Sequence, residues 1–327
     1  MDEHQEDVVK DRMDGPAIEV EALRKVYGGG VEAVAGIDLE VSPGEVFGLL
    51  GPNGAGKSTT IGMLTSTVEP TSGSARLGGY DVRTDALSAR RISSVLFQDP
   101  VVDRPLTGRR NLEIHARLWG IDSRRAEERL ADIVEAFDLF ELIGRPVETY
   151  SGGERRRLEI ARALVSEPQV LFMDEPTVGL DPRIRHELLD VIAGLRDRNE
   201  MTILLTTHYL DEAERLSDRI AIMRAGEVVA IGTPSDLVAS LGEALVELRV
   251  PSEPEIALAS LRTKNIAGPE AFAVGSTLIL PTRGRAPGRV IDDIRDGGTA
   301  TLSIVSRRPT LDDVYLQLTG DRPAEAA

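Results

Sequence analysis

The sequence of 327 residues predicts an α/β fold followed by a small α+β domain. Short apolar runs at Val46–Leu50, Val170–Met173 and Thr202–Thr206 have the composition of parallel strands that are buried on both faces of a sheet. After Ala244, the strand and helix patterns follow the order β-α-β-β-α-β, which is typical of a ferredoxin-like domain. The length is enough for two domains and a sizeable core.

Alternating apolar and polar residues predict an antiparallel flank ahead of the first buried strand. Ala17–Leu23 and Val34–Val41 both alternate, and the second run ends at the turn Ser42-Pro-Gly44. A helix is expected to start near Thr59. Further segments are predicted as strands over 73–77 and 92–97, a mainly helical stretch over 112–140 with an apolar stripe, a helix between the last two buried strands, and a hairpin over 220–231 around Ala225-Gly226.

The C-terminal part shows six further elements and a closing helix. The predictions are strands over 245–250, 272–274, 277–280 and 301–305, and helices over 253–261 and 287–295. An amphipathic helix over 310–318 starts at a Thr310 cap and stops at Gly320. We expect a disordered acidic tail over 1–16, a first domain over 17–243 with a helical subdomain over 99–165, a second domain over 244–320 and a tail over 321–327.

The composition argues against several classes of protein. The net charge is −16 and the pI is about 4.8, which opposes broad binding to phosphate backbones, so no nucleic-acid partner is expected. The chain contains no cysteine, which rules out disulfides and thiolate metal sites. No window approaches the roughly 18 consecutive apolar residues that span a bilayer, so any membrane role is expected to come through a partner.

The most informative segment is Gly51-Pro-Asn-Gly-Ala-Gly-Lys57-Ser58, followed by Thr59. It fits the G-x-x-x-x-G-K-[ST] phosphate loop and stands between a buried strand and a helix, as that loop requires. Its glycines let backbone N–H groups close around phosphate oxygens, Lys57 can reach the outer phosphates, and the Ser58 hydroxyl can ligate Mg²⁺. The expected ligand is a nucleoside triphosphate, and the alternative is a glycine-rich turn without a ligand.

An acidic pair, Asp174-Glu175, follows the second apolar run. The end of a strand would place Asp174 beside the metal ion, and Glu175 could polarise an attacking water. The pair alone is a weak signal, and a solvated acidic turn is the alternative. Its position after the phosphate loop and before the segment Pro176–Asp181 favours a nucleotide site.

The segment Ser151-Gly-Gly-Glu154 opens a predicted helix that runs from Arg155 to Val165. By local physics it is a capping box, with Ser151 as the N-cap and Glu154 three residues later. Two glycines in the first turn cost helix stability, which makes sense if another group, such as a phosphate, must approach the backbone closely. A helix that is merely capped is the alternative.

One of the histidines differs from the others by its position. His208 follows an apolar strand, at the end of which a parallel sheet presents groups to ligands. His115 and His186 lie in helical patterns and are expected to be ordinary surface or packing residues. Trp119, the only tryptophan, is expected in the core or at an interface of the helical subdomain.

With these motifs in this order, the chain resembles the nucleotide-binding subunit of an ABC transporter over residues 17 to 240. The resemblance implies an ABC-type P-loop NTPase fold, with a RecA-like core, an antiparallel β flank and a helical subdomain, and it implies ATP and Mg²⁺ as ligands. The site residues that it implies are Tyr27, Gly51, Pro52, Asn53, Gly54, Ala55, Gly56, Lys57, Ser58 and Thr59 for ATP; Ser151, Gly152, Gly153 and Glu154 for the signature; Asp181 for the D-loop; Glu175, His208 and Gln98 for catalysis; and Ser58, Gln98 and Asp174 for Mg²⁺.

The resemblance also implies a mechanism shared between two subunits. They pair head to tail, so that each ATP lies between one phosphate loop and the Ser151 helix of the other subunit. Glu175 would act as general base, His208 would sense the γ-phosphate, and Tyr27 would stack on adenine, although Tyr27 could instead close a strand edge.

Two residues depart from the family's pattern. The signature usually ends in glutamine, whereas Glu154 would place a charge near the γ-phosphate, which is unfavourable unless Arg155 or the cap hydrogen bond offsets it. Arg110 stands where relatives generally have an acidic residue, so coupling to a transporter would use different surface charges.

The C-terminal part, which closes with Pro309–Gly320, is similar to ATPases of the daunorubicin-exporter type. The resemblance implies a homodimer at the cytoplasmic face of the cell membrane, held there by a separate permease that exports a hydrophobic compound. The helical subdomain around Gln98–Trp119 is expected to receive the permease, and the last helix to pack across subunits. The alternatives are an ABC ATPase that acts on nucleic acid or ribosomes, which generally carries paired domains, coiled coils, zinc modules or basic surfaces, and a regulatory protein that does not hydrolyse ATP.

Overall fold

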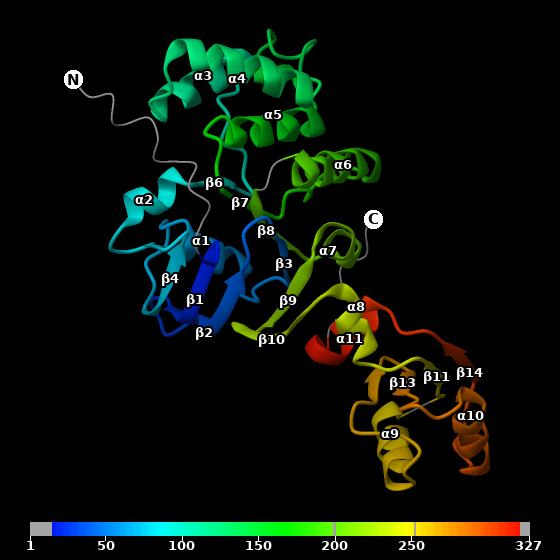
Figure 1. The fold of residues 1–327 in the computed structure, drawn as a ribbon. Helices are drawn as coiled ribbons and strands as arrows, with labels where there is room; N and C mark the ends of the chain where they lie inside the picture. Colours follow the sequence, from blue (N-terminus) through cyan, green and yellow to red (C-terminus); the bar gives the residue numbers. More distant parts are fainter. Residues whose placement is uncertain (1–14, 199–200, 252, 321–327) are drawn as a thin grey trace. The chain divides into compact units, whose positions relative to one another are not determined.

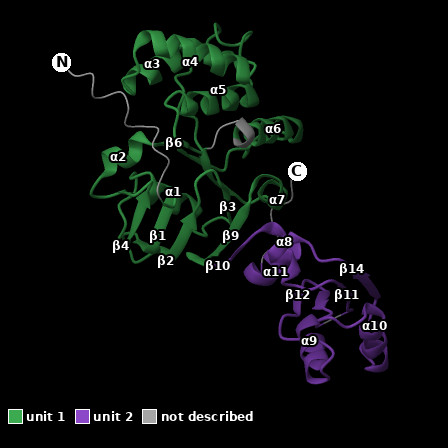
Figure 2. Cartoon of the chain, viewed as in Figure 1, with its two compact units in different colours: residues 1–228, 325–327 green, residues 229–324 purple. Residues whose placement is uncertain are grey.

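The computed structural model describes residues 15–198, 201–251 and 253–320, drawn in Figure 1 in colours that follow the sequence. The chain divides into two compact units, the first ending at Val228 and the second beginning at Val229 (Figure 2). The predicted domain boundary between residues 243 and 244 falls inside the second unit. The predicted tails over 1–16 and 321–327 lie outside the described residues, apart from Gly15 and Pro16.

The three apolar runs of the sequence form neighbouring parallel strands of a six-stranded sheet, in the order β10-β9-β3-β8-β7-β6. Every residue of β3, β8 and β7 is buried, as expected for strands that are covered on both faces. The predicted hairpin turns through Ala225 and Gly226, which both have positive φ angles of 50° and 84°. The bounds are β3 Val46–Leu50, β6 Ser93–Leu96, β7 Val170–Asp174, β8 Thr202–Thr207, β9 Arg219–Arg224 and β10 Glu227–Gly232.

The predicted antiparallel flank is confirmed as a second sheet, in the order β2-β1-β4-β5. Strand β1 pairs antiparallel with β2 on one side and with β4 on the other. Helix α1 (Lys57–Leu64) contacts β2 and β4 of this sheet and β7 of the six-stranded sheet, so one core joins them. The bounds are β1 Ile18–Val26, β2 Glu32–Val41, β4 Ser72–Leu77 and β5 Tyr80–Asp81.

The mainly helical stretch is two helices, α3 (Gly108–Leu118) and α4 (Ser123–Ala136), which lie beside α5 (Gly152–Leu164) in Figure 1. The break between them has local causes. Gly120 adopts a φ of 71°, and the Asp122 side chain accepts the N–H groups of Arg124 and Arg125 to cap α4. Other helices of this unit are α2 Ala86–Arg91, α6 Pro182–Arg198 and α7 Leu210–Leu216, and η1 (Val147–Thr149) is a 3₁₀ turn.

The second unit has a four-stranded sheet in the order β12-β13-β11-β14, in which each neighbouring pair is antiparallel. The six elements from β11 to β14 follow the predicted order, and helices α9 and α10 share a core with β11 and β13. The bounds are α8 Pro234–Ala239, β11 Leu245–Arg249, α9 Pro254–Thr263, β12 Phe272–Val274, β13 Thr277–Pro281, α10 Pro287–Asp296, β14 Ser303–Arg307 and α11 Leu311–Thr319.

The last helix, α11, begins and ends as predicted. Thr310 forms a capping box with Asp313, and Gly320 ends the helix with a φ of 75°. The apolar side chains of Leu311, Val314 and Tyr315 are buried within the chain, and α11 packs against α8. These side chains are therefore not free to pack across subunits, and the predicted role of the helix would need its other faces.

Among the helices that the structure describes, none combines the length and the apolar character that crossing a bilayer requires.

Candidate functional site

The phosphate loop, Gly51–Gly56, connects the end of β3 to the start of α1. Two of its glycines are required by their surroundings. A β-carbon on Gly51 would lie 2.5 Å from the carbonyl oxygen of Met223, and one on Gly56 would lie 2.4 Å from that of Ala33. Gly56 also has a φ of 107°, which favours glycine. The loop therefore keeps its backbone at the N-terminus of an eight-residue helix, an arrangement suited to phosphate.

The parallel pairing of β3, β8 and β7 brings the carboxyl ends of these strands to one edge of the sheet. Five predicted residues from these ends and from α1 lie close together. We call them the strand-end cluster: Lys57, Ser58, Asp174, Glu175 and His208.

Lys57 connects the phosphate loop to the acidic pair. Its Nζ donates to the carbonyl oxygens of Gly51 at 2.8 Å and Pro52 at 3.3 Å. The same nitrogen lies 3.2 Å from Oε1 of Glu175, and both side chains are buried. A cation at this point can neutralise negative charge that approaches the loop.

Asp174 and Ser58 form a pair of oxygen donors. The Ser58 hydroxyl donates to Oδ1 of Asp174 at 3.1 Å, and the Thr206 hydroxyl donates to the same oxygen at 2.6 Å. Hydroxyl and carboxylate oxygens are hard donors of the kind that Mg²⁺ prefers. The donor set therefore fits a magnesium ion, with Thr206 fixing the orientation of the carboxylate.

Glu175 has an unusual backbone and a polar environment. Its φ is 45°, a left-handed conformation that a non-glycine residue adopts at a cost of about 1–3 kcal/mol. Oε1 lies 3.2 Å from Nδ1 of His208 and 3.2 Å from Nζ of Lys57. The pKa of Glu175 is lowered, first by His208 and then by Lys57, against burial, which raises it. The carboxylate is therefore ionised at neutral pH and can accept a proton.

The contact between His208 and Glu175 is close in distance but not well aligned. Within the described part of the chain, Nδ1 of His208 makes no hydrogen bond of good geometry. The centre of the His208 ring lies 4.1 Å from that of the Tyr209 ring, with the two planes tilted by 40°. The side chain is thus held at the cluster while its ring nitrogens keep hydrogen-bonding capacity for another group.

Gln98 and Tyr27 lie outside the strand-end cluster. Gln98 follows β6 with an exposed side chain, and among the described residues it makes no hydrogen bond to Ser58 or Asp174. Tyr27 is 41 % exposed, and its hydroxyl lies 3.5 Å from that of Thr59 beside the phosphate loop. The magnesium role of Gln98 and the stacking role of Tyr27 stay predictions.

The helix α5 begins with the predicted capping box. The Ser151 hydroxyl accepts the N–H of Glu154 at 3.3 Å, and the Glu154 carboxylate accepts the N–H of Ser151 at 2.6 Å. The second bond is the main cause of the lowered pKa of Glu154. Arg155 donates to the carbonyl oxygen of Tyr150 instead, so the cap and not Arg155 holds the charge of Glu154.

Gly153 is explained by packing within the chain. A β-carbon there would lie 2.2 Å from Cγ2 of Ile184 on α6. This packing alone accounts for the glycine, without the close approach of a phosphate that the sequence suggested. A β-carbon on Gly152 would meet only Leu180, at an ordinary 3.6 Å. Asp181 caps α6 by accepting the N–H of Ile184 at 3.1 Å.

The sequence reasoning missed a buried polar network beside the cluster. Glu212 on α7 is 1 % exposed and accepts hydrogen bonds from Arg185 at 2.7 Å, from the Thr207 hydroxyl at 2.7 Å and from the Thr177 hydroxyl. The Arg185 guanidinium also lies 4.0 Å from the ring of Tyr209. The network holds both neighbours of His208. Its polar residues are scattered along the sequence, and no local pattern indicates that they meet.

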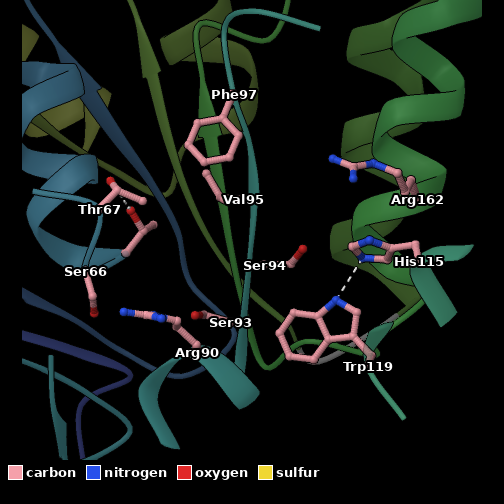
Figure 3. A pocket seen from close by; sticks show the side chains of 11 residues that line it. Ser66, Thr67, Arg90, Ser93, Ser94, Val95, Phe97, His115, Trp119 and Arg162 are labelled. Carbon is pink, nitrogen blue, oxygen red and sulfur yellow. Dashed lines mark hydrogen bonds between the residues drawn. The ribbon is translucent and has the colours of Figure 1, made fainter. Parts of the chain in front are cut away.

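A separate pocket of about 390 Å³ lies between the six-stranded sheet and the helical region (Figure 3). Within it, the indole N–H of Trp119 donates to Nε2 of His115 at 3.0 Å. Burial, with Arg162 nearby, lowers the pKa of His115 to about 4, so the ring is neutral at pH 7. The lining residues are Thr65, Ser66, Thr67, Arg90, Ser93, Ser94, Val95, Phe97, His115, Trp119 and Arg162, which include two arginines and no carboxylate.

Comparison with known proteins identifies the class of this site. A family model described as ABC transporter matches residues 34–178. The daunorubicin/doxorubicin resistance ATP-binding protein of Streptomyces peucetius is 43 % identical, with 95 % of this chain and 96 % of that protein covered. The linearmycin resistance ATP-binding protein of Bacillus subtilis (strain 168) is 35 % identical, with 93 % and 98 % covered. The solved structure of cbiO1 from Clostridium perfringens, part of an ABC transporter complex, has a TM-score of 0.64 and 28 % identity, and covers 69 % of this chain and 92 % of that one.

Proposed function

Because the chain belongs to the ABC transporter family, as an ATP-binding protein that couples ATP hydrolysis to transport, we propose that it powers the export of a hydrophobic compound through a separate membrane permease. The observation that carries the ATPase part is the strand-end cluster, in which Lys57, Asp174, Glu175 and His208 lie at one edge of the sheet. The names of the relatives, which concern resistance to daunorubicin, doxorubicin and linearmycin, support a drug or an antibiotic as the exported compound.

Two residues of the cluster would hold Mg²⁺. Ser58 and Asp174 supply the hydroxyl and carboxylate oxygens, and Gln98 would join them from the loop that follows β6. The ion, when bound, neutralises charge on the phosphates. Thr206 fixes the oxygen of Asp174 that Ser58 also contacts.

The other residues of the cluster would carry out the hydrolysis. The carboxylate of Glu175, which His208 and Lys57 keep ionised by lowering its pKa, accepts a proton from the attacking water. Lys57 contacts the outer phosphates from the helix N-terminus, and His208 donates to the γ-phosphate. Tyr27, exposed beside Thr59, stacks on the adenine ring.

A second copy of the chain would complete each site. We propose a head-to-tail homodimer in which Ser151, Gly152 and Gly153 at the start of α5 face the ATP bound to the partner. In each chain the carboxylate of Glu154 accepts the N–H of Ser151. The negative charge of Glu154 therefore lies at the N-terminal cap of its own helix. Asp181, at the start of α6, lies near the same surface because Gly153 packs against Ile184.

The permease would bind at the pocket of Figure 3 and would hold the protein at the cytoplasmic face of the membrane. The pocket supports this role because Phe97, from the loop that carries Gln98, shares it with Trp119 from the helical region. A cytoplasmic helix of the permease seated there would contact both. The second unit, with its β-α-β-β-α-β order, is proposed to be a ferredoxin-like regulatory domain.

Affinity purification tests the proposed partner. Tagged Glu175→Gln protein is bound to Mg-ATP in a detergent extract of membranes from its own host, and the proteins that come with it are identified. We expect to recover a polytopic membrane protein, and we expect less of it when Trp119→Ala is added. Phe140→Ala is the control, because Phe140 is exposed and lies outside the pocket. Recovery of only ribosomal or DNA-bound proteins in several mild detergents would contradict the export function.

A further inference from the structure

Arg156 is buried against the backbone of the turn that carries Glu175, although no sequence motif singles it out. It is the middle one of three consecutive arginines in the first turns of α5, and it alone of the three is buried, with 7 % of its surface exposed. A buried arginine needs partners for its charge and its N–H groups. The positions of those partners indicate what role Arg156 has in the site.

The guanidinium of Arg156 donates to backbone carbonyls of two different segments. Nε donates to the oxygen of Pro176 at 2.7 Å, and Nη1 donates to the oxygen of Phe97 at 2.7 Å. Nη2 makes longer contacts to the oxygens of Asp174 at 3.5 Å and Glu175 at 3.4 Å. One planar group therefore holds the turn after β7 and the residue that precedes Gln98.

The turn that Arg156 contacts is the strained one. Glu175 has a φ of 45°, and such a conformation persists only where the surroundings hold it. On one side, the N–H of Glu175 donates to the hydroxyl of Thr206 at 2.9 Å. On the other side, Arg156 binds the carbonyls before and after this residue. The two contacts fix the peptide planes that aim the Glu175 side chain.

The charge of Arg156 is balanced within α5. Glu159, one turn later and 2 % exposed, accepts from Nη1 at 2.9 Å. The ion pair allows the guanidinium to stay buried while its other N–H groups bind the carbonyls. A lysine would keep the charge but has one nitrogen, which cannot reach carbonyls on two segments in the fixed plane of an arginine.

We propose that Arg156 is a positioning residue for ATP hydrolysis: it fixes the Glu175 turn to the loop that carries Gln98. The proposal rests on the proposed function, since it assumes that Glu175 is the general base. Arg156 thus links the Glu175 turn, the loop after β6 and helix α5. The N-terminus of α5 would face the partner's ATP. A change in the loop after β6 would thereby reach Glu175 through a single side chain.

The test compares Arg156→Lys with Arg157→Lys, a matched control on the same helix whose side chain is only partly buried. For Arg156→Lys we expect kcat for ATP to fall by about 10- to 100-fold while KM changes less than about twofold, because a small misplacement of a reacting group lowers the rate of chemistry more than binding. The melting temperature is expected to stay close to that of the wild type. Arg157→Lys is expected to keep both kinetic constants.

A double variant covers the possibility that a single change harms folding. Arg156→Met/Glu159→Met removes both buried charges together and should fold, but it still lacks the donors for the carbonyls. We expect the same loss of kcat. A wild-type kcat in either Arg156 variant, or a parallel loss of kcat, ATP affinity and melting temperature in Arg156→Lys, would overturn the positioning role.

Amide hydrogen exchange separates this proposal from the proposed function, because it requires no turnover. The backbone amides of residues 97–99, 175, 177 and 178 are expected to exchange faster in Arg156→Lys than in the wild type, with exchange in α5 unchanged. Unchanged exchange in both segments would overturn the proposal even if the ATPase is active. A wild-type protein that binds ATP but never hydrolyses it would instead refute the proposed function, whatever the exchange shows.

Discussion

Arg185→Met is expected to lower the free energy of unfolding by about 3–5 kcal/mol, because removing one partner of a buried ion pair leaves the other charge uncompensated. Glu212, 1 % exposed, would lose the Nε donor at 2.7 Å and keep only neutral hydroxyl donors. Asp211, the other carboxylate bound by Arg185, is 56 % exposed and would be solvated by water. The cost therefore comes from Glu212 and not from Asp211.

The same helix offers a control of the same residue type. Arg183 pairs with Glu187 at 3.1 Å, but its side chain is 87 % exposed. Water screens such a pair, so Arg183→Met is expected to cost less than about 1 kcal/mol. The contrast between the two variants isolates burial as the cause.

Urea denaturation followed by the fluorescence of Trp119 measures the free energy of unfolding of both variants. Trp119 is the only tryptophan and lies in the same unit of the chain as Arg183 and Arg185. The double variant Arg185→Met/Glu212→Gln should recover part of the loss, because it removes the orphaned charge. Arg185→Met should also lower kcat, since Thr207 and Tyr209, the neighbours of His208, both contact the network. A loss for Arg185→Met no larger than that for Arg183→Met would refute the reasoning.

Two further predictions concern other elements. The pKa of His115 is about 4 in the folded protein and about 6.5 in the unfolded chain, so the unfolded chain binds more protons between these pH values. The contribution of His115 to the free energy of unfolding is therefore fully present above pH 6.5 and is lost as the pH falls to 4. The loss reaches about 3 kcal/mol. Trp119 fluorescence should titrate near pH 4, His115→Gln should remove this pH dependence, and a midpoint near 6.5 would contradict the burial argument. Gly153→Ala should cost about 1–3 kcal/mol in urea denaturation through the clash with Ile184, whereas Gly152→Ala should be nearly neutral; equal effects would contradict the packing explanation.

The sheet was predictable because its strands carry a strong signal. Val46–Leu50 contains no polar side chain, and a strand of this kind has to be covered on both faces. The helices α2 and α7 were missed because six or seven residues are fewer than two turns, too short to show a period of 3.6. The stretch over 112–140 is mainly helical, as predicted, but the prediction did not place the break at Gly120 and Asp122, which end one helix and cap the next.

The site was predictable where residues follow strand ends. Lys57, Glu175 and His208 meet because parallel neighbouring strands end at one edge of a sheet. Arg156 could not be chosen over its neighbours Arg155 and Arg157, since only the packing of α5 decides which of the three is buried. The local physics of the Ser151 cap was predictable from four residues, because both partners of a capping box are close in sequence.

The most direct test of the strand-end cluster as an ATPase site is to measure ATP binding and turnover side by side for Glu175→Gln and the wild type with Mg²⁺. The amide of glutamine cannot accept the proton of water as the carboxylate does, while Lys57, Ser58 and the phosphate loop are unchanged. ATP affinity close to that of the wild type, with multiple turnover abolished, is the predicted result. Substantial multiple turnover by the purified, contaminant-free variant would contradict the role of Glu175 as general base.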